Sequence, residues 1–155
     1  MEMILTEPKT LKINDIKNID FSMVKMKLQD KEEGQGWTDE ECNLAEQEYL
    51  KFLALKRAYP EIDIVPNKMV DVFWHQHILD TQKYAEDCEK VFGYFLHHYP
   101  YFGMNGPADA QNLADAFEET RELYFIHFGK DYAGQSSKCK SKPTCRTQCK
   151  PMKCK

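Results

Sequence analysis

Histidine, cysteine and aspartate gather in the stretch VDVFWHQHILDTQKYAEDC, residues 70–88. Imidazole nitrogen, thiolate sulfur and carboxylate oxygen are the ligand atoms that zinc, iron and copper accept in proteins. One hypothesis is therefore a metal site made by His75 and His77 with His98 or His127 from later in the chain. The alternative is that these side chains pack and hydrogen-bond the helices of the fold together.

The spacing of the two nearest histidines restricts such a site. Successive residues of a continuous α-helix are turned by about 100°, so His75 and His77 point about 200° apart and cannot bind one ion. A helix that ended at either histidine could bring both rings together in an unwound turn before Asp80. Otherwise one histidine is functional and the other is structural.

In that second case His75 is the functional candidate. Asp71 lies four residues before it and could accept its ring N–H, as carboxylates beside metal-binding histidines do. His77 falls on the apolar side of the same predicted helix and is then a core histidine, hydrogen-bonded to a neighbouring helix.

The other polar and aromatic residues of the stretch are interpreted as structural or as supporting the ligands. They are Trp74, Tyr84, Asp87 and Cys88. Cys88 lies in an apolar stripe, where a free cysteine acts as a small hydrophobe. A nucleophilic Cys88 paired with a histidine is the enzymatic alternative, but apolar surroundings raise the pKa of a thiol. The sequence has no phosphate-binding glycine loop and no GxSxG motif, so we expect a non-enzymatic protein.

Helical periodicity predicts the elements that position these residues. A short helix ends near Lys27 after a cap at Asp20 or Ser22, and a long helix follows a capping box of Thr38 and Glu41 and stops at Pro60. On this long helix Glu46, Glu48 and Lys51 are predicted to face water.

Three further elements follow in the sequence. One helix begins at Pro66 and Asn67, and Asp80 with Thr81 caps the next. The apolar stripe of that next helix reaches His98, with Gly93 as a weak point within it or as its end. In the loop HHYPYFGMNGP, the aromatic side chains Tyr99, Tyr101 and Phe102 are expected to pack on the body.

A last helix is predicted from Pro107 to Gly129, and His127 lies on its core stripe. No strand pattern of comparable strength occurs. The sequence therefore predicts an all-α fold, a bundle of four or five helices.

Charge divides the chain into a predicted helical domain, residues 1–134, and a tail, residues 135–155. The chain has 21 basic and 25 acidic residues, and the tail contains seven of the basic ones and none of the acidic ones, so the domain carries 14 − 25 = −11 and the tail +7. An acidic domain disfavours nucleic acid, although the tail could contact phosphates weakly and without specificity. Without a signal peptide or a long apolar run, we expect a cytoplasmic protein with no membrane partner.

The tail holds Cys139, Cys145, Cys149 and Cys154, separated by five, three and four residues, which is not the paired CxxC of zinc ribbons. It contains no Leu, Ile, Val or aromatic residue and is therefore predicted to be disordered. Neighbouring lysines favour thiolates, which could bind copper(I) or zinc or take part in redox chemistry. The alternatives are a solvated tail without a specific role, and a peptide presented for enzymatic modification.

The motif VDxxWHxHxL, followed by Tyr, Asp-Cys and Gly, resembles that of the glycine-rich domain-containing protein-like family. Its positions here are Val70, Asp71, Trp74, His75, His77, Leu79, Tyr84, Asp87, Cys88 and Gly93. The resemblance covers about residues 11–133. Plant members are longer and carry a glycine-rich region, so this chain is similar to a short, single-domain version. The resemblance implies a fold and a motif but no reaction.

The leading functional hypothesis is a non-enzymatic helical domain that binds zinc, iron or copper, or a protein partner, through the WHxH region. Its thiol-rich tail adds soft-metal or redox chemistry. A protein interaction or scaffold module with a purely structural motif is the first alternative. A carrier of a modified peptide tail and a Cys/His-dependent enzyme are the others.

Overall fold

The chain forms helices and no strands in residues 11–132, the part that this computed structural model describes. The elements in order are η1 (Ile16–Asn18, a 3-10 helix), α1 (Ser22–Gln29), α2 (Asp39–Ala58), α3 (Lys68–Leu79), α4 (Thr81–Phe92) and α5 (Gly106–Phe128). The predicted all-α bundle is thereby confirmed, with five α-helices. The predicted disorder of residues 135–155 and the boundary at residue 134 lie outside the described residues.

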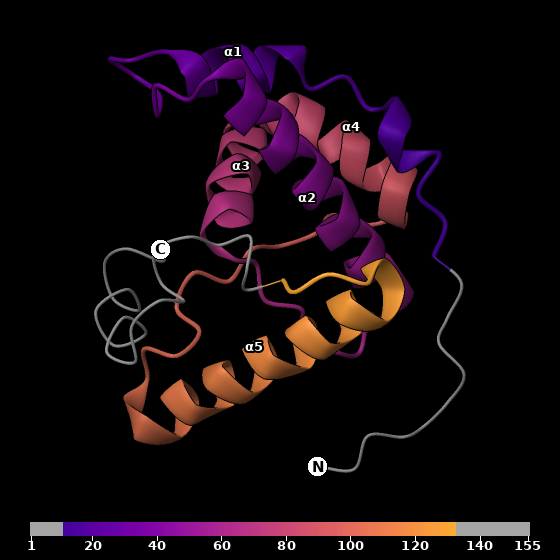
Figure 1. The fold of residues 1–155 in the computed structure, drawn as a ribbon, viewed down its shortest axis with the longest axis vertical. Coiled ribbons are helices and arrows are strands. Elements are labelled where there is room, and N and C mark those ends of the chain that lie inside the picture. Colours follow the sequence, from indigo (N-terminus) through magenta and orange to yellow (C-terminus); the bar gives the residue numbers. More distant parts are fainter. Residues whose placement is uncertain (1–10, 133–155) are drawn as a thin grey trace.

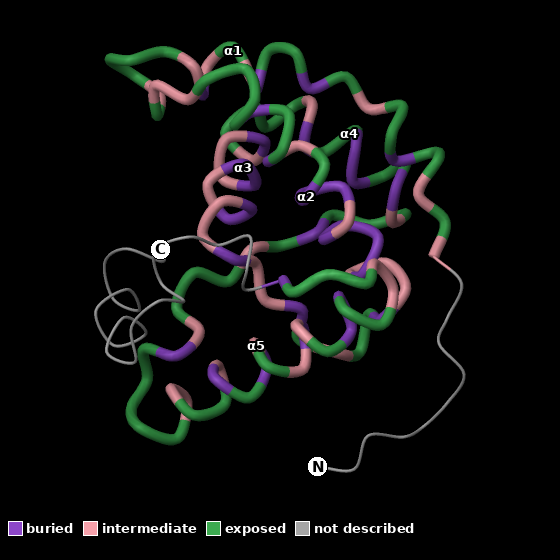
Figure 2. The backbone as a smooth tube through the Cα atoms, in the orientation of Figure 1, coloured by how far each residue is buried: buried purple, intermediate pink, exposed green. Residues whose placement is uncertain are grey.

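Helix α3 is the central element of the bundle. It packs against α1, α2 and α4, while the long helix α5 lies across the other end of the molecule (Figure 1). A connection of residues 93–105 links α4 to α5. The buried positions of α2, α3 and α4 face one another, as the purple segments of Figure 2 show, so the core surrounds α3.

Helix α2 starts at the predicted capping box. The Glu41 amide donates to Thr38 Oγ1 at 3.1 Å, and the Thr38 amide donates to Glu41 Oε1 at 2.9 Å. Two amide groups that a helix start leaves unpaired are satisfied in this way. The helix ends at Ala58, two residues before Pro60, which cannot continue it.

Helix α3 runs without a break through both histidines of the motif. The side chain of Asn67 caps its start by accepting from the Val70 amide at 2.9 Å, and the helix ends only at Leu79. His75 and His77 therefore project from different sides of one continuous helix. A shared site in an unwound turn before Asp80 does not form, because the turn comes after both residues.

Helix α4 ends where Gly93 adopts a left-handed conformation with φ 77°. A residue with a Cβ is strained in that conformation, which makes glycine the favoured residue there. The chain turns at this point, so Phe95 and His98 leave the helical stripe on which Cys88 lies. Of the two possibilities for Gly93, the structure has the one in which it ends the helix.

Two expectations about exposure were wrong. Glu48 was expected to face water, but it is buried, accepts a hydrogen bond from the Tyr124 hydroxyl and pairs with Lys51 at 3.2 Å. Helix α5 supplies Tyr124, a packing partner that the periodicity of α2 cannot reveal. The expectation that the loop aromatics pack on the body was wrong for Tyr99 and Tyr101, whose side chains are 62% and 57% exposed and contact each other with ring centroids 5.5 Å apart. Phe102, the third of these aromatics, is partly buried.

Removal of the α2 cap provides a test of the local fold. Thr38→Ala deletes the hydroxyl that accepts from the Glu41 amide and is expected to lower the free energy of unfolding by about 0.5–2 kcal/mol. Urea denaturation followed by circular dichroism measures this change. Thr38→Ser keeps the hydroxyl and should stay close to the parent; equal stability of all three proteins would show that the cap contributes nothing.

Candidate metal centre

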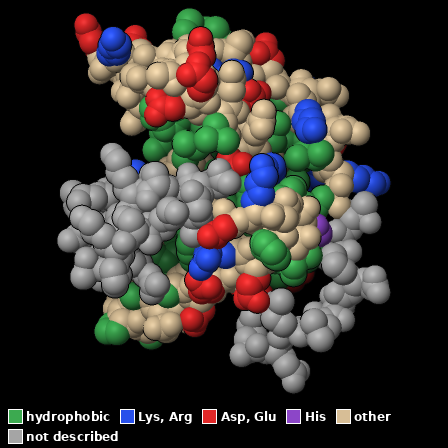
Figure 3. All heavy atoms as spheres, viewed as in Figure 1, with side chains coloured by type: hydrophobic (Ala, Val, Ile, Leu, Met, Phe, Trp, Pro, Cys, Tyr) green, Lys and Arg blue, Asp and Glu red, His purple; other side chains and the backbone are tan. Residues whose placement is uncertain are grey.

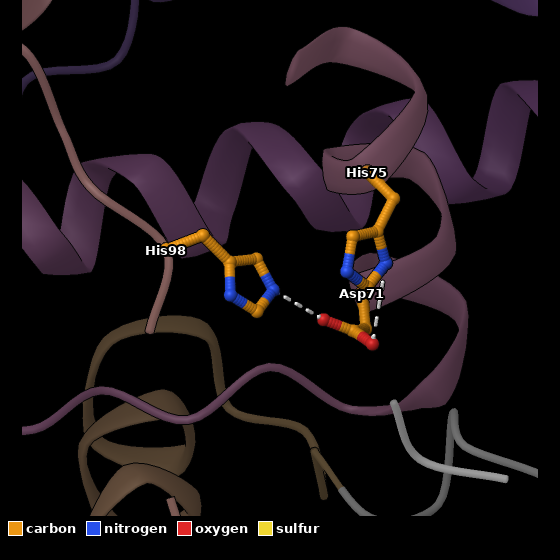
Figure 4. A group of neighbouring side chains, drawn as sticks. All are labelled: Asp71, His75 and His98. Atoms are coloured by element: carbon orange, nitrogen blue, oxygen red, sulfur yellow. Dashed lines mark hydrogen bonds and ion pairs between the residues drawn. The ribbon is translucent and has the colours of Figure 1, made fainter. Parts of the chain in front are cut away.

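Asp71, His75 and His98 come together at the surface of the bundle. Asp71 and His75 are one turn apart on α3, and His98 comes from the connection between α4 and α5 (Figure 4). One potential ligand atom from each residue lies within 4.8 Å of the other two. Asp71 and His98 are 27 positions apart in the chain. The fold thus brings two imidazoles and one carboxylate to the same point.

Two distances in this triad, each to a different oxygen of Asp71, resemble those between neighbouring ligands of one ion. His98 Nε2 lies 2.9 Å from Asp71 Oδ1, and His75 Nδ1 lies 3.5 Å from Asp71 Oδ2. Two atoms that are each about 2.1 Å from zinc are separated by about 3.0 Å at a right angle and about 3.4 Å at the tetrahedral angle. The His75 and His98 rings also stack, with centroids 4.7 Å apart and an interplanar angle of 23°.

The Asp71 carboxylate is buried but only partly satisfied. Its side chain is 5% exposed, and Oδ2 has no hydrogen-bond partner within the described part of the chain. A buried oxygen without a partner loses its hydration and gains nothing in return. The His75 side chain remains 41% exposed. Solvent ions therefore have access to the triad from the His75 side.

Other residues of the motif hold His98 in place. The Trp74 ring contacts the His98 ring with centroids 4.1 Å apart, and Trp74 Nε1 donates to the Tyr84 hydroxyl at 2.9 Å. That hydroxyl donates in turn to the Leu96 carbonyl, while the Leu96 amide donates to Cys88 Sγ at 3.5 Å. Helix α4 thus fixes both the carbonyl and the amide of Leu96, two residues before His98.

These supporting groups are kept neutral by their surroundings. Burial raises the pKa of the Cys88 thiol and of the Tyr84 hydroxyl above their usual values. Cys88 is 2% exposed, so its sulfur is available neither to solvent nor to the triad. The structure therefore places Cys88 in packing and hydrogen bonding.

His77 lies in a separate network on the opposite side of α3. Its Nδ1 is 2.8 Å from the Tyr49 hydroxyl, and its Nε2 is 2.8 Å from Asp87 Oδ2, which also lies 3.2 Å from Lys83 Nζ. Both ring nitrogens are thus paired, one with Tyr49 of α2 and the other with Asp87 of α4. The adjoining cavity of about 10 Å³ is at the lower limit of the about 10–15 Å³ that one water needs.

The remaining candidates do not join the triad. His127 Nε2 is 2.8 Å from the Tyr59 hydroxyl, so this histidine links α5 to the end of α2. The tail cysteines, Cys139, Cys145, Cys149 and Cys154, lie outside the described residues. Of the four histidines considered as ligands, the structure brings together His75 and His98.

Sequence reasoning treated Asp71 as a partner of His75 and not as a ligand. The sequence did indicate that Asp71 could join His75 in binding a metal. The two residues are four positions apart and so share one helix face, and two metal-binding side chains are commonly placed at that spacing. The approach of His98 had no comparable signal. It depends on the turn at Gly93 and on the two hydrogen bonds that fix Leu96.

The chain matches one known protein family. Residues 12–119 match the family described as UCP032817-like, and this region contains all three residues of the triad. The chain belongs to the UCP032817-like family. The family description names no reaction, ligand or partner. No curated protein and no solved structure matches the chain.

The helices of this UCP032817-like domain are amphipathic or short. Within residues 11–132, none has the length and continuous apolar character needed to cross a membrane. The matched region ends at residue 119 and so does not include the cysteine-rich tail.

The buried position of His77 predicts a pH dependence of stability. Burial lowers the pKa of His77 in the folded chain below its usual 6.5. The unfolded chain then takes up a proton at a higher pH than the folded chain, so stability is complete above about pH 6.5 and falls as pH drops toward the folded-state pKa. One such group contributes at most about 1.4 kcal/mol per pH unit.

Urea midpoints measured from pH 7.5 to pH 5.5 test this. The parent midpoint should fall on acidification, and His77→Gln should remove most of the slope. His127→Gln is the matched variant, because burial also lowers the pKa of this less buried histidine, and it should remove a smaller part. A flat midpoint in the parent contradicts the prediction whatever the variants do.

Proposed function

We propose that the UCP032817-like domain binds a divalent transition metal through Asp71, His75 and His98. The observation that supports this most directly is the buried oxygen Asp71 Oδ2, which has no hydrogen-bond partner among residues 11–132 and faces an imidazole nitrogen 3.5 Å away. A cation between these atoms would satisfy the oxygen. It would also replace the hydrogen bond between His98 and the other carboxylate oxygen with two coordinate bonds.

The donor set favours zinc or iron(II). Two imidazoles and one carboxylate suit first-row transition metals, whereas calcium and magnesium prefer oxygen alone. Copper accepts imidazole as well and is the third candidate. Three protein ligands leave at least one coordination position for water or another group.

The geometry supports binding more than it supports the enzymatic alternative. A nucleophilic cysteine must be ionised and accessible, whereas Cys88 is buried, accepts a hydrogen bond from the Leu96 amide and has a raised pKa. The likeness to the glycine-rich domain-containing protein-like family agrees with this proposal, since Asp71 and His75 both belong to the shared motif.

A purely structural triad is the competing proposal. The hydrogen bond between His98 and Asp71 ties the connection between α4 and α5 to α3 whether or not an ion is present. A scaffold module would need nothing more. The two proposals differ in one respect that can be measured, which is the affinity of the full chain for an added metal ion.

The test uses the full-length chain with Cys139, Cys145, Cys149 and Cys154 replaced by serine, so that tail thiols cannot bind the metal. This protein is expected to bind one Zn²⁺ per chain in isothermal titration calorimetry. Asp71→Asn and His98→Ala should each weaken binding at least about a hundredfold, since even partners one shell outside the ligands are worth 10–100-fold. His97→Ala, which changes an exposed neighbour of His98, is the matched control and should bind as the parent does.

Asp71→Asn retains the shape of the side chain and an acceptor oxygen, so circular dichroism and urea denaturation can confirm that the variant is folded. A folded Asp71→Asn or His98→Ala chain that binds Zn²⁺ as tightly as the parent would exclude the triad. Absence of binding in the parent that lacks the four tail cysteines would exclude the proposed function and leave the structural role.

A further inference from the structure

Two buried polar atoms of residues 11–132 have no hydrogen-bond partner, and they belong to residues one helical turn apart. One is Asp71 Oδ2, the oxygen of the proposed centre, and the other is Asn67 Nδ2. Asn67 is 3% exposed, so its amide group is almost entirely removed from bulk solvent. A buried polar group without a partner costs free energy unless a ligand satisfies it. The start of α3 thus carries one unpaired donor beside one unpaired acceptor.

The cap of α3 fixes which atom of the Asn67 amide is free. Asn67 Oδ1 accepts from the Val70 amide at 2.9 Å. Exchanging the oxygen and the nitrogen would bring two donors face to face, so Nδ2 is the unpaired atom. A side-chain amide nitrogen only donates, and it therefore requires a ligand atom with a free lone pair.

The backbone and a second side chain show that Asn67 and Asp71 are close. The Asn67 carbonyl accepts from the Asp71 amide at 2.9 Å, and helical side chains lean toward the N-terminus, so the carboxylate leans toward the turn that Asn67 caps. The Tyr132 hydroxyl accepts from the Asn67 amide at 2.6 Å. Burial raises the pKa of this hydroxyl, and the charge of Asp71 adds to the rise. The carboxylate is therefore within electrostatic range of a group bonded to Asn67.

A metal ion alone would satisfy one of the two unpaired atoms. A cation on Asp71 Oδ2 repels an N–H group, so Asn67 Nδ2 would remain without a partner. Three protein ligands leave at least one coordination position open, and a divalent ion with one carboxylate and two neutral imidazoles has a net charge of +1. A carboxylate ligand makes the centre neutral, which partial burial favours. It also has two oxygens, one for the metal and one for the N–H donor.

The charge of the domain makes this local arrangement necessary for an anion. Residues 1–134 carry 14 − 25 = −11, and acidic side chains occur over both the upper helices and α5 on the face drawn in Figure 3. Such a domain repels anions in general. An anion is therefore expected to bind where a cation and a free N–H group lie together, and not to bind the metal-free domain.

We infer that the metal held by Asp71, His75 and His98 binds a small carboxylate, and that Asn67 Nδ2 donates a hydrogen bond to its second oxygen. The inference rests on the proposed function. On binding, a bond between the metal and a carboxylate oxygen forms, a metal–water bond breaks, and no proton is transferred. The ligand has to be small, like formate or acetate, because both unpaired atoms are buried. The half-exposed side chain of His75 marks the side from which it enters.

Acetate is the probe, and it is titrated into the full-length chain that carries serine at the four tail cysteines and is loaded with Co²⁺. The visible d–d absorption of Co²⁺ changes when a ligand replaces water, so a saturable change is expected. Calorimetry on the metal-free protein should show no acetate binding. Asn67→Ser and Asn67→Asp keep an oxygen that can cap α3 but lack the N–H donor. Each should weaken acetate binding at least about tenfold, the effect of one hydrogen bond to a charged group, without weakening Co²⁺ binding.

Asn112→Asp is the matched control for Asn67→Asp, because it adds the same charge at an exposed position of α5 and should bind acetate as the parent does. Acetate binding of parental strength in both Asn67 variants would overturn the role of Asn67. A Co²⁺-loaded parent that does not respond to acetate would overturn the inference and leave the triad as a metal site. Loss of Co²⁺ binding in both Asn67 variants would mean that Asn67 shapes the triad and would overturn the inference as well. A parent that binds no Co²⁺ and no Zn²⁺ would overturn the proposed function and the inference with it.

Discussion

The buried carboxylate of Asp71 is the constraint on which the site depends. It sits in the first turn of α3, where unpaired amides and the helix dipole stabilise negative charge, and this start is fixed by the Asn67 cap. His98 provides one strong partner, but within the described residues the second oxygen has no hydrogen bond and only the His75 imidazole nitrogen 3.5 Å away. At the surface of the bundle, the start of α3 therefore presents a carboxylate that is fixed by His98 on one side and has an unpaired oxygen on the other.

Because α3 is a continuous helix, His75 and His77 of the WHxH motif lie on different sides of it and have different surroundings. His77 has both ring nitrogens engaged by neighbouring helices and is 2% exposed, so it joins α2, α3 and α4 in the core. His75 faces the opposite side and remains accessible. The buried residues of the motif also position the accessible triad. Trp74 contacts His98 directly and, through Tyr84, fixes the backbone at Leu96.

The elements could be predicted from the sequence because their ends are encoded locally. Thr38 and Glu41, Asn67, Pro107 and Gly129 mark helix ends through hydrogen bonds or backbone conformations within a few residues. Contacts between distant segments were not predictable in this way. Glu48 was predicted to face water because the sequence of α2 does not show that Tyr124 of α5 packs against it. His98 was placed on the apolar stripe that continues α4, whereas the turn at Gly93 directs the chain away from that stripe.

The structural and metal-binding roles of the triad differ greatly in energy. A hydrogen bond to a charged group contributes about 1.5–3 kcal/mol, whereas structural zinc sites have apparent binding free energies of about 10–16 kcal/mol. An ion bound at the proposed centre would therefore replace the hydrogen bond between His98 and Asp71 at little relative cost. The two imidazole rings already lie side by side, with centroids 4.7 Å apart. In either role, the contact between His98 and Asp71 ties the connection between α4 and α5, where Tyr99 and Tyr101 are exposed, to α3.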